Sequence, residues 1–300
     1  MELIFLGTGA GMPSKSRNVS ALALWLEQRG SFWLFDCGEA TQHQIMHTRV
    51  KLGKIEKIFI THLHGDHLFG LPGLLGSRSF QGAGKPLALY GPPGIKRFVE
   101  VALETSQTHL TYELEILEVG EGVVLDQQGF KVVCRKLEHG LDSYGYRVEE
   151  ADRPGTLLSG KLQAHGVPGG PLYAALKRGE DAAWNGEVLR SVDFVSASKP
   201  GRVVAILGDT RYCEAAVELA KGADLLVHEA SFASGDSQLA ADYFHSTARE
   251  AALVAKRSEA NKLVLTHISA RYQSEDILLA EAREVHPHTV IAHDLESVST

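Results

Sequence analysis

The sequence contains a series of short apolar runs of strand length, nearly all of which end in a cluster with Gly, Asp or His. These runs cover residues 3–6, 32–35, 58–60, 132–134, 203–207, 225–227 and 263–265. Short runs rich in Ile, Val, Leu and Phe are typical of buried β-strands. Because the polar clusters follow the strands, the pattern favours a layered α/β fold with a functional site beyond the carboxyl ends of its strands.

Helices are predicted between these strands. Helical periodicity covers residues 95–107, 214–221 and 274–286, and Thr247 with Glu250 three residues later predicts a capping box for a helix over 247–258. The chain has 300 residues, of which 44% are hydrophobic and 22% charged, so it can bury a large core. We therefore expect one α/β domain over residues 1–300.

One stretch, residues 152–199, departs from this pattern. Its apolar periodicity is weak, and the segment 166–171 (GVPGGP) is rich in turn-forming residues. A long insertion in a compact domain is either a functional element or a decorated surface loop. The residues alone leave both interpretations open.

The strongest chemical signal is the run from His62 to His67 (HLHGDH), directly after a predicted strand. Buried His and Asp cost free energy unless they are paired or bind a metal. His62 and His64 lie two positions apart in extended chain and can face one point, while Gly65 allows a turn that directs Asp66 and His67 elsewhere. The motif therefore predicts half-sites for two metal ions.

Three later residues, His139, Asp209 and His267, each follow a predicted strand and are expected at the same end of the sheets. A carboxylate can bridge two cations and a histidine cannot, so Asp209 is the predicted bridge. The predicted ligands are His62, His64 and His139 for the first metal, and Asp66, His67 and His267 for the second. This mixed set favours Zn²⁺, with Mn²⁺ as the alternative.

Two such ions, about 3.5–4 Å apart, suit hydrolysis of a phosphodiester, because they activate hydroxide and stabilise the attacking and leaving oxygens. Asp66 is predicted to orient or deprotonate the attacking water. The formal net charge of −7 at first argues against a nucleic-acid partner. Two bound Zn²⁺ would reduce it to −3, and a substrate meets the local field, so the global charge does not decide the substrate class.

The sequence predicts a cytoplasmic protein without a membrane segment. Cys37, Cys134 and Cys213 lie far apart without a CxxC pair, which favours a reducing compartment. The amino-terminal residues have no basic region with a cleavage site, and no apolar run approaches the ~20 residues of a membrane span.

Taken together, the HxHxDH motif and the later His, Asp and His resemble the metallo-β-lactamase superfamily over the whole chain. This resemblance implies an αβ/βα four-layer sandwich with an inserted flexible arm. Finer motifs are similar to the short form of the tRNase Z family. They are PxKxRN at 13–18, FDCGE at 35–39, a HEAT-like motif at 228–231 with Ser231 in place of Thr, HST at 245–247, and the Gly/Pro-rich segment 166–171 of that family's tRNA-binding arm.

The tRNase Z resemblance implies a zinc-dependent endoribonuclease that removes 3′ trailers from precursor tRNA and leaves a 3′-hydroxyl. It also implies two Zn²⁺ per subunit, a homodimer, and the metal ligands given above. Asp66 would accept the proton, His245 would stabilise charge on the scissile phosphate or leaving oxygen, and Glu229 would orient His245. The implied substrate contacts are Lys15, Arg17, Asn18, Gly166, Pro168, Gly170 and Pro171. Within the arm, Lys161, Lys177 and Arg178 are candidate phosphate contacts.

Several alternatives remain open at this point. From the residues alone, a solvated turn is favoured over an RNA contact for Lys15 and Arg17. We expect Asp36 to support the metal ligands rather than to catalyse. Another hydrolase on the same scaffold is a competing function, for example a lactamase, a thioesterase or a general phosphodiesterase. A metal-stabilised binding module is less favoured, because a structural zinc site has no use for Asp66 or an open coordination position.

Overall fold

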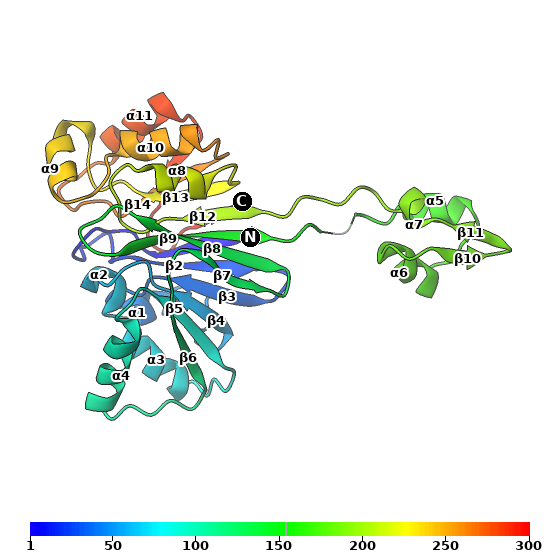
Figure 1. Ribbon diagram of the computed structural model, residues 1–300, viewed down its shortest axis with the longest axis horizontal. Helices are drawn as coiled ribbons and strands as arrows, with labels where there is room; N and C mark the ends of the chain where they lie inside the picture. Colours follow the sequence, from blue (N-terminus) through cyan, green and yellow to red (C-terminus); the bar gives the residue numbers. More distant parts are fainter. Residues whose placement is uncertain (154) are drawn as a thin grey trace. The chain divides into compact units, whose positions relative to one another are not determined.

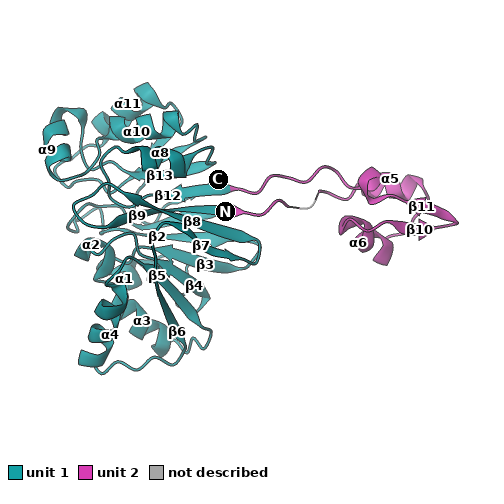
Figure 2. Ribbon diagram, in the orientation of Figure 1, with its two compact units in different colours: residues 1–148, 203–300 teal, residues 149–202 magenta. Residues whose placement is uncertain are grey.

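The computed structural model describes residues 1–153 and 155–300 (Figure 1). It contains two compact units, one formed by residues 1–148 with 203–300 and the other by residues 149–202 (Figure 2). Both large β-sheets belong to the first unit, apart from the last two residues of one strand, 149 and 150. None of the helices in the described ranges is long and apolar enough to cross a membrane.

The first sheet has the strand order β16-β1-β2-β3-β4-β5-β6. These strands are β16 (Ser297–Ser299), β1 (Glu2–Gly7), β2 (Ala21–Leu26), β3 (Ser31–Phe35), β4 (Ile55–Phe59), β5 (Leu87–Gly91) and β6 (Leu114–Glu118). The strands from β3 to β6 are parallel. Its outer face packs against η1 (Leu52–Lys54), α1 (Thr41–Met46), α2 (Gly65–Leu68), α3 (Leu71–Phe80) and α4 (Ile95–Thr105). Leu71, Leu74 and Leu75 lie on one face of α3 and are fully buried, so packing fixes this helix to the sheet.

The second sheet has the strand order β15-β14-β13-β12-β9-β8-β7. These strands are β15 (Thr289–Ile291), β14 (Leu263–Thr266), β13 (Leu225–Glu229), β12 (Val203–Ile206), β9 (Ser143–Glu150), β8 (Phe130–Leu137) and β7 (Gly122–Gln127). The outer face is covered by α8 (Glu214–Ala220), α10 (Ala248–Arg257) and α11 (Asp276–Val285), while η2 (Ser234–Asp236) and α9 (Ser237–Asp242) precede α10. Thr247 and Glu250 form the expected capping box at the start of α10.

The two sheets face each other across a shared aromatic and aliphatic core. Trp33 of the first sheet contacts Phe130 of the second, with ring centroids 5.4 Å apart, and Phe59 contacts Tyr146 at 5.2 Å. All four side chains are buried, and rings of this size supply a large share of the burial between layers. With helices on both outer faces, the molecule has the layers αβ/βα, so the predicted fold class is confirmed.

The second unit has a small core of its own. It contains α5 (Ser159–Ala164), α6 (Pro171–Lys177), β10 (Ala182–Trp184), β11 (Glu187–Leu189) and α7 (Ser191–Phe194). Its buried side chains are Leu162, Val167, Leu176, Ala182, Leu189 and Phe194. Gly166 has a φ of 72° after the end of α5, and Pro171 begins α6, so the Gly/Pro-rich segment closes one helix and opens the next. The predicted insertion 152–199 falls in this unit, except that residue 154 lies outside the described residues.

Candidate metal centre

Residues from both sheets meet beyond the carboxyl ends of their strands. His62, His64, Asp66 and His67 follow β4, while His139 follows β8, Asp209 follows β12 and His267 follows β14. All seven belong to the first unit. They form two groups, and within each group the ligand atoms lie within 4.8 Å of one another. One group is His62, His64 and His139, and the other is Asp66, His67, Asp209 and His267.

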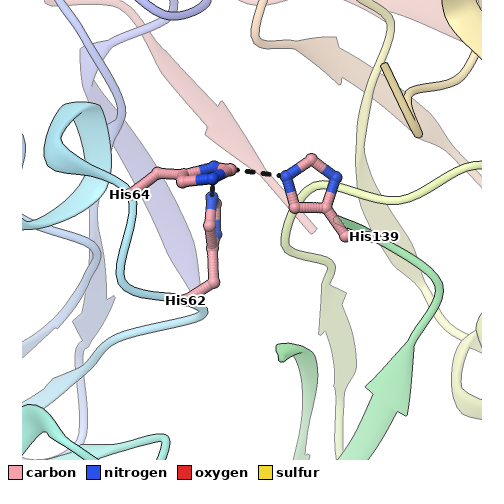
Figure 3. Close-up of side chains that lie close together, drawn as sticks. All are labelled: His62, His64 and His139. Atoms are coloured by element: carbon pink, nitrogen blue, oxygen red, sulfur yellow. Dashed lines mark hydrogen bonds between the residues drawn. The ribbon is translucent and has the colours of Figure 1, made fainter. Parts of the chain in front are cut away.

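In the first group, three ring nitrogens face one another (Figure 3). His64 Nδ1 lies 3.1 Å from His62 Nε2 and 3.2 Å from His139 Nε2. The Thr61 hydroxyl donates to Asp36 Oδ2 at 2.9 Å, so it accepts the hydrogen bond from His62 Nδ1 at 3.0 Å. His139 Nδ1 donates to the Phe244 carbonyl at 2.9 Å. Because the Nδ1 atoms of His62 and His139 carry the ring hydrogens, their Nε2 atoms present lone pairs to the same point. A divalent cation fits this arrangement.

Asp209 lies between the two groups. Its Oδ2 atom is 3.2 Å from His267 Nε2, 3.4 Å from His67 Nε2 and 3.7 Å from His62 Nε2. Asp66 joins the second group, with Oδ2 3.3 Å from His267 Nε2. One carboxylate therefore faces histidines of both groups, which is the geometry expected of a bridging ligand.

The protonation of Asp209 and His62 favours cation binding. Burial opposes the charged form of Asp209, but His267 and His67 hold the pKa of this carboxyl well below its ordinary value. Burial and the neighbouring His67 lower the pKa of His62, so its ring is neutral at pH 7. A neutral imidazole and a carboxylate anion are the forms in which these side chains bind metal ions. Burial opposes protonation of His67, but Asp209 and Asp36 raise its pKa well above the ordinary value, so a bound cation has to displace a proton from that ring.

Two further residues hold the candidate ligands in place. Asp36 accepts hydrogen bonds from the Thr61 amide and from His67 Nδ1, both at 2.7 Å, in agreement with its expected supporting position. The Ser231 hydroxyl accepts from His267 Nδ1 at 2.9 Å and donates to Glu229 Oε2 at 2.9 Å. The sequence motif assigns no separate role to Ser231, and only its position two residues after Glu229 points to this contact. Such partners orient ligating histidines and fix their tautomers.

His245 and Glu229 form a pair beside the metal centre. His245 Nδ1 donates to Glu229 Oε1 at 2.7 Å, and the same oxygen accepts the Thr210 amide at 3.0 Å. Burial opposes protonation of His245, but the Glu229 carboxylate outweighs it and raises the pKa of the histidine to about 9. A cavity of about 300 Å³ is lined by His245 together with Asp66 and His139, so a proton donor shares the cavity with the candidate ligands.

The expected substrate contacts have mixed positions. Lys15 is exposed, and Asn18 is half-buried with its side-chain amide donating to the Glu39 carbonyl at 2.8 Å. The position of Arg17 corrects both expectations for this residue. Its side chain is buried against Glu275 and the Ala292 carbonyl, so it is neither a surface phosphate contact nor part of a solvated turn. Among the arm residues, Gly166, Pro168, Gly170 and Pro171 are exposed in the second unit.

The layered sheets and the His/Asp groups at their strand ends define a protein of the metallo-β-lactamase fold. Residues 180–268 match the family model described as beta-lactamase superfamily domain, and residues 1–145 match the model described as anti-Pycsar protein Apyc1. The crystal structure of human tRNase Z, short form, is similar with a TM-score of 0.73 and 32% identity, covering 100% of this chain and 99% of that one.

Relatives named ribonuclease Z are similar over the full length of the chain. The protein from Anoxybacillus flavithermus is 58% identical over 303 residues, covering 100% of this chain and 97% of its own length. The protein from Geobacillus kaustophilus is also 58% identical, covering 100% of this chain and 99% of its own. This chain therefore belongs to the ribonuclease Z family, and the predicted enzyme class, a hydrolase, is confirmed.

Proposed function

We propose that this chain is an endoribonuclease that removes 3′ trailers from precursor tRNA and leaves a tRNA 3′-hydroxyl, using two Zn²⁺ ions per subunit, with Mn²⁺ as the alternative metal. The observation that carries this proposal is the pair of adjacent donor groups, in which Asp209 of the second group also faces His62 of the first, in a chain of the ribonuclease Z family. Histidine nitrogens mixed with carboxylate oxygens suit zinc.

Each residue of the site has a task in this reaction. When bound, the two cations would lower the pKa of water and stabilise charge on the phosphate oxygens. Asp66 accepts the proton of the attacking water, and its Oδ2 is oriented by the Gly11 amide at 2.9 Å. His245 hydrogen-bonds the leaving 3′-oxygen and is held for this by Glu229. Asp36 and Ser231 keep the His67 and His267 rings in position.

The second unit is proposed to bind the body of the tRNA. The segment 166–171, which is exposed except for Val167, offers backbone groups for this contact, and Lys161 and Lys177 are exposed cations for phosphates. Arg178 pairs with Glu180 at 2.8 Å, so an RNA phosphate would have to compete for its guanidinium. Lys15, on the loop that also carries Gly11, is the proposed phosphate contact near the metal centre.

The reaction is tested by incubating the purified protein with a 3′-extended precursor tRNA and mapping both new ends. We expect one internal cut, giving a tRNA with a 3′-hydroxyl and an intact trailer. Asp66→Asn should keep the fold, as seen by near-ultraviolet circular dichroism, and lose several orders of magnitude in rate, since the proton acceptor and a ligand charge are removed. Turnover of a small phosphodiester without cleavage of precursor tRNA would instead favour a general phosphodiesterase.

We further propose that the protein is a cytoplasmic homodimer, in which the second unit of one subunit presents tRNA to the metal centre of the other. Size-exclusion chromatography with light scattering should give twice the 32.6 kDa mass of the chain at micromolar concentration. A monomer at that concentration which still processes precursor tRNA would contradict this arrangement.

A further inference from the structure

The loop of residues 8–18 carries a buried arginine. Arg17 is only 6% exposed, and its Nε donates to Glu275 Oε1 at 3.1 Å, with Nη2 contacting the same oxygen. Its Nη1 donates to the Ala292 carbonyl at 2.7 Å and contacts the Thr8 hydroxyl. Burying a guanidinium is costly unless its donors are bonded, and here both arms of the fork have partners within the protein.

These partners attach both ends of the loop to the carboxyl-terminal part of the chain. Besides the Arg17 contacts, the Thr8 hydroxyl donates to Asp294 Oδ1 at 2.6 Å, and the backbone amide of Asn18 donates to Asp294 Oδ2 at 2.6 Å. The loop ends are also joined to each other, because the Gly9 amide donates to the Asn18 carbonyl at 2.8 Å. Arg17 is therefore one of several bonds that fix where the loop begins and ends.

Between its ends, the loop contacts the metal centre directly. The Gly11 amide donates to Asp66 Oδ2 at 2.9 Å. The Ala10 amide donates to the Ile268 carbonyl at 3.1 Å, and the Ile268 amide donates to the Thr8 carbonyl at 2.8 Å. Since Ile268 directly follows His267, the loop supports a ligand candidate on each side, Asp66 through its carboxylate and His267 through the backbone.

We infer that Arg17 is a positioning residue, which clamps the loop 8–18 to the carboxyl-terminal segment so that the Gly11 amide holds Asp66 at the metal centre. It does not contact RNA. The inference rests on the proposed function only for the part that Asp66 plays in catalysis. In this arrangement one basic loop divides its tasks: Arg17 faces inward and orients the site, and Lys15 is the side chain left at the surface for a phosphate.

The test compares Arg17→Lys with Lys15→Ala, a change in the same loop. Arg17→Lys keeps the charge but loses the fork that reaches Glu275 and Ala292 together. We expect it to weaken zinc binding about 10- to 100-fold, measured by chelator competition without substrate, and to lower kcat by a similar factor with KM for precursor tRNA unchanged. Lys15→Ala should leave zinc affinity unchanged, raise KM, and reduce the slope of log binding constant against log salt by about 1.

Glu275→Gln is a second variant that distinguishes a positioning role of Arg17 from an RNA contact. If Arg17 acts through the clamp, removing its partner charge should weaken zinc binding in the same direction as Arg17→Lys. If Arg17 instead contacts RNA, freeing it should tighten precursor-tRNA binding and leave zinc affinity unchanged. That result, or a raised KM for precursor tRNA in Arg17→Lys with normal zinc affinity, would overturn the inference. Zinc affinity and hydrolysis of a small phosphodiester need no tRNA, so these readouts stay decisive even if the tRNA assignment fails.

Discussion

Replacing Asp209 with alanine should remove most of the bound metal and lower hydrolysis by several orders of magnitude. The Asp209 side chain is buried, and its Oδ2 lies within 3.7 Å of ring nitrogens from three histidines. Without this carboxylate, two cations at close range would lose the anion between them, and their mutual repulsion would no longer be compensated. Metal content by elemental analysis, measured beside the rate on a small phosphodiester, checks both parts.

Two companion variants sharpen the Asp209 experiment. Asp209→Asn keeps the shape of the side chain and removes its charge, so it should show the same loss if charge and bridging are responsible. Asp126→Ala changes an exposed carboxylate on β7 and should leave metal content and rate unchanged. Metal content and turnover near those of the unmodified enzyme in Asp209→Asn would rule out a shared carboxylate.

Deleting the second unit should separate recognition of tRNA from the chemistry at the metal centre. The deletion can be closed by a short linker, because the Glu150 amide donates to the Arg202 carbonyl at 2.9 Å and brings the two ends together. Removing residues 152–199 should cost a large factor in cleavage of precursor tRNA, mostly through a higher KM. Hydrolysis of a small phosphodiester should stay within a few-fold, since the seven ligand candidates lie in the first unit.

The charge of the second unit makes the salt dependence informative. Residues 149–202 contain seven Lys and Arg against seven Asp and Glu, so this unit is formally neutral within a chain of net charge −7. The proposed binding of tRNA to this unit would then rely on particular cationic side chains. Replacing Lys161 and Lys177 with glutamine should reduce the salt slope by roughly 1.8, at about 0.9 per phosphate contact of a duplex. Lys51→Gln, an exposed lysine of the first unit, is the matched control.

The deletion has two results that would contradict the proposed task of the second unit. An equal loss on precursor tRNA and on the small ester would mean that these residues support the fold of the first unit. Equal retention on both would place the general phosphodiesterase ahead of the tRNA-processing enzyme.

Much of the layered fold was predictable because its strands are short, apolar and followed by polar clusters. The predicted helix over 247–258 appears as α10 with its capping box, and the predicted helix over 95–107 as α4. The strands that were not identified from the sequence include β2 and β5, although both are largely buried. A short buried strand is an apolar run without alternation, which periodicity does not distinguish from other buried segments.

Long-range partners explain what sequence reasoning missed. Arg17 bonds to Glu275 and to the Ala292 carbonyl, which are both distant in sequence. Without these partners, a basic loop motif looks like a surface contact. The small core of the second unit was hidden for another reason. Its helices and strands are only three to seven residues long, too short to show a period, and its order depends on packing among them.

The origin of the candidate ligands in two different sheets has a consequence for how the molecule holds together. His62 to His67 follow β4 of the first sheet, whereas His139, Asp209 and His267 follow strands of the second. Neither half of the sandwich supplies a complete set, so a bound cation cross-links the two halves at one edge of their common core. Folding and metal uptake would then be linked, with the metal adding to the stability that the shared core provides. Free metal at a hundred times its dissociation constant would stabilise the joined halves by about 2.7 kcal/mol per site.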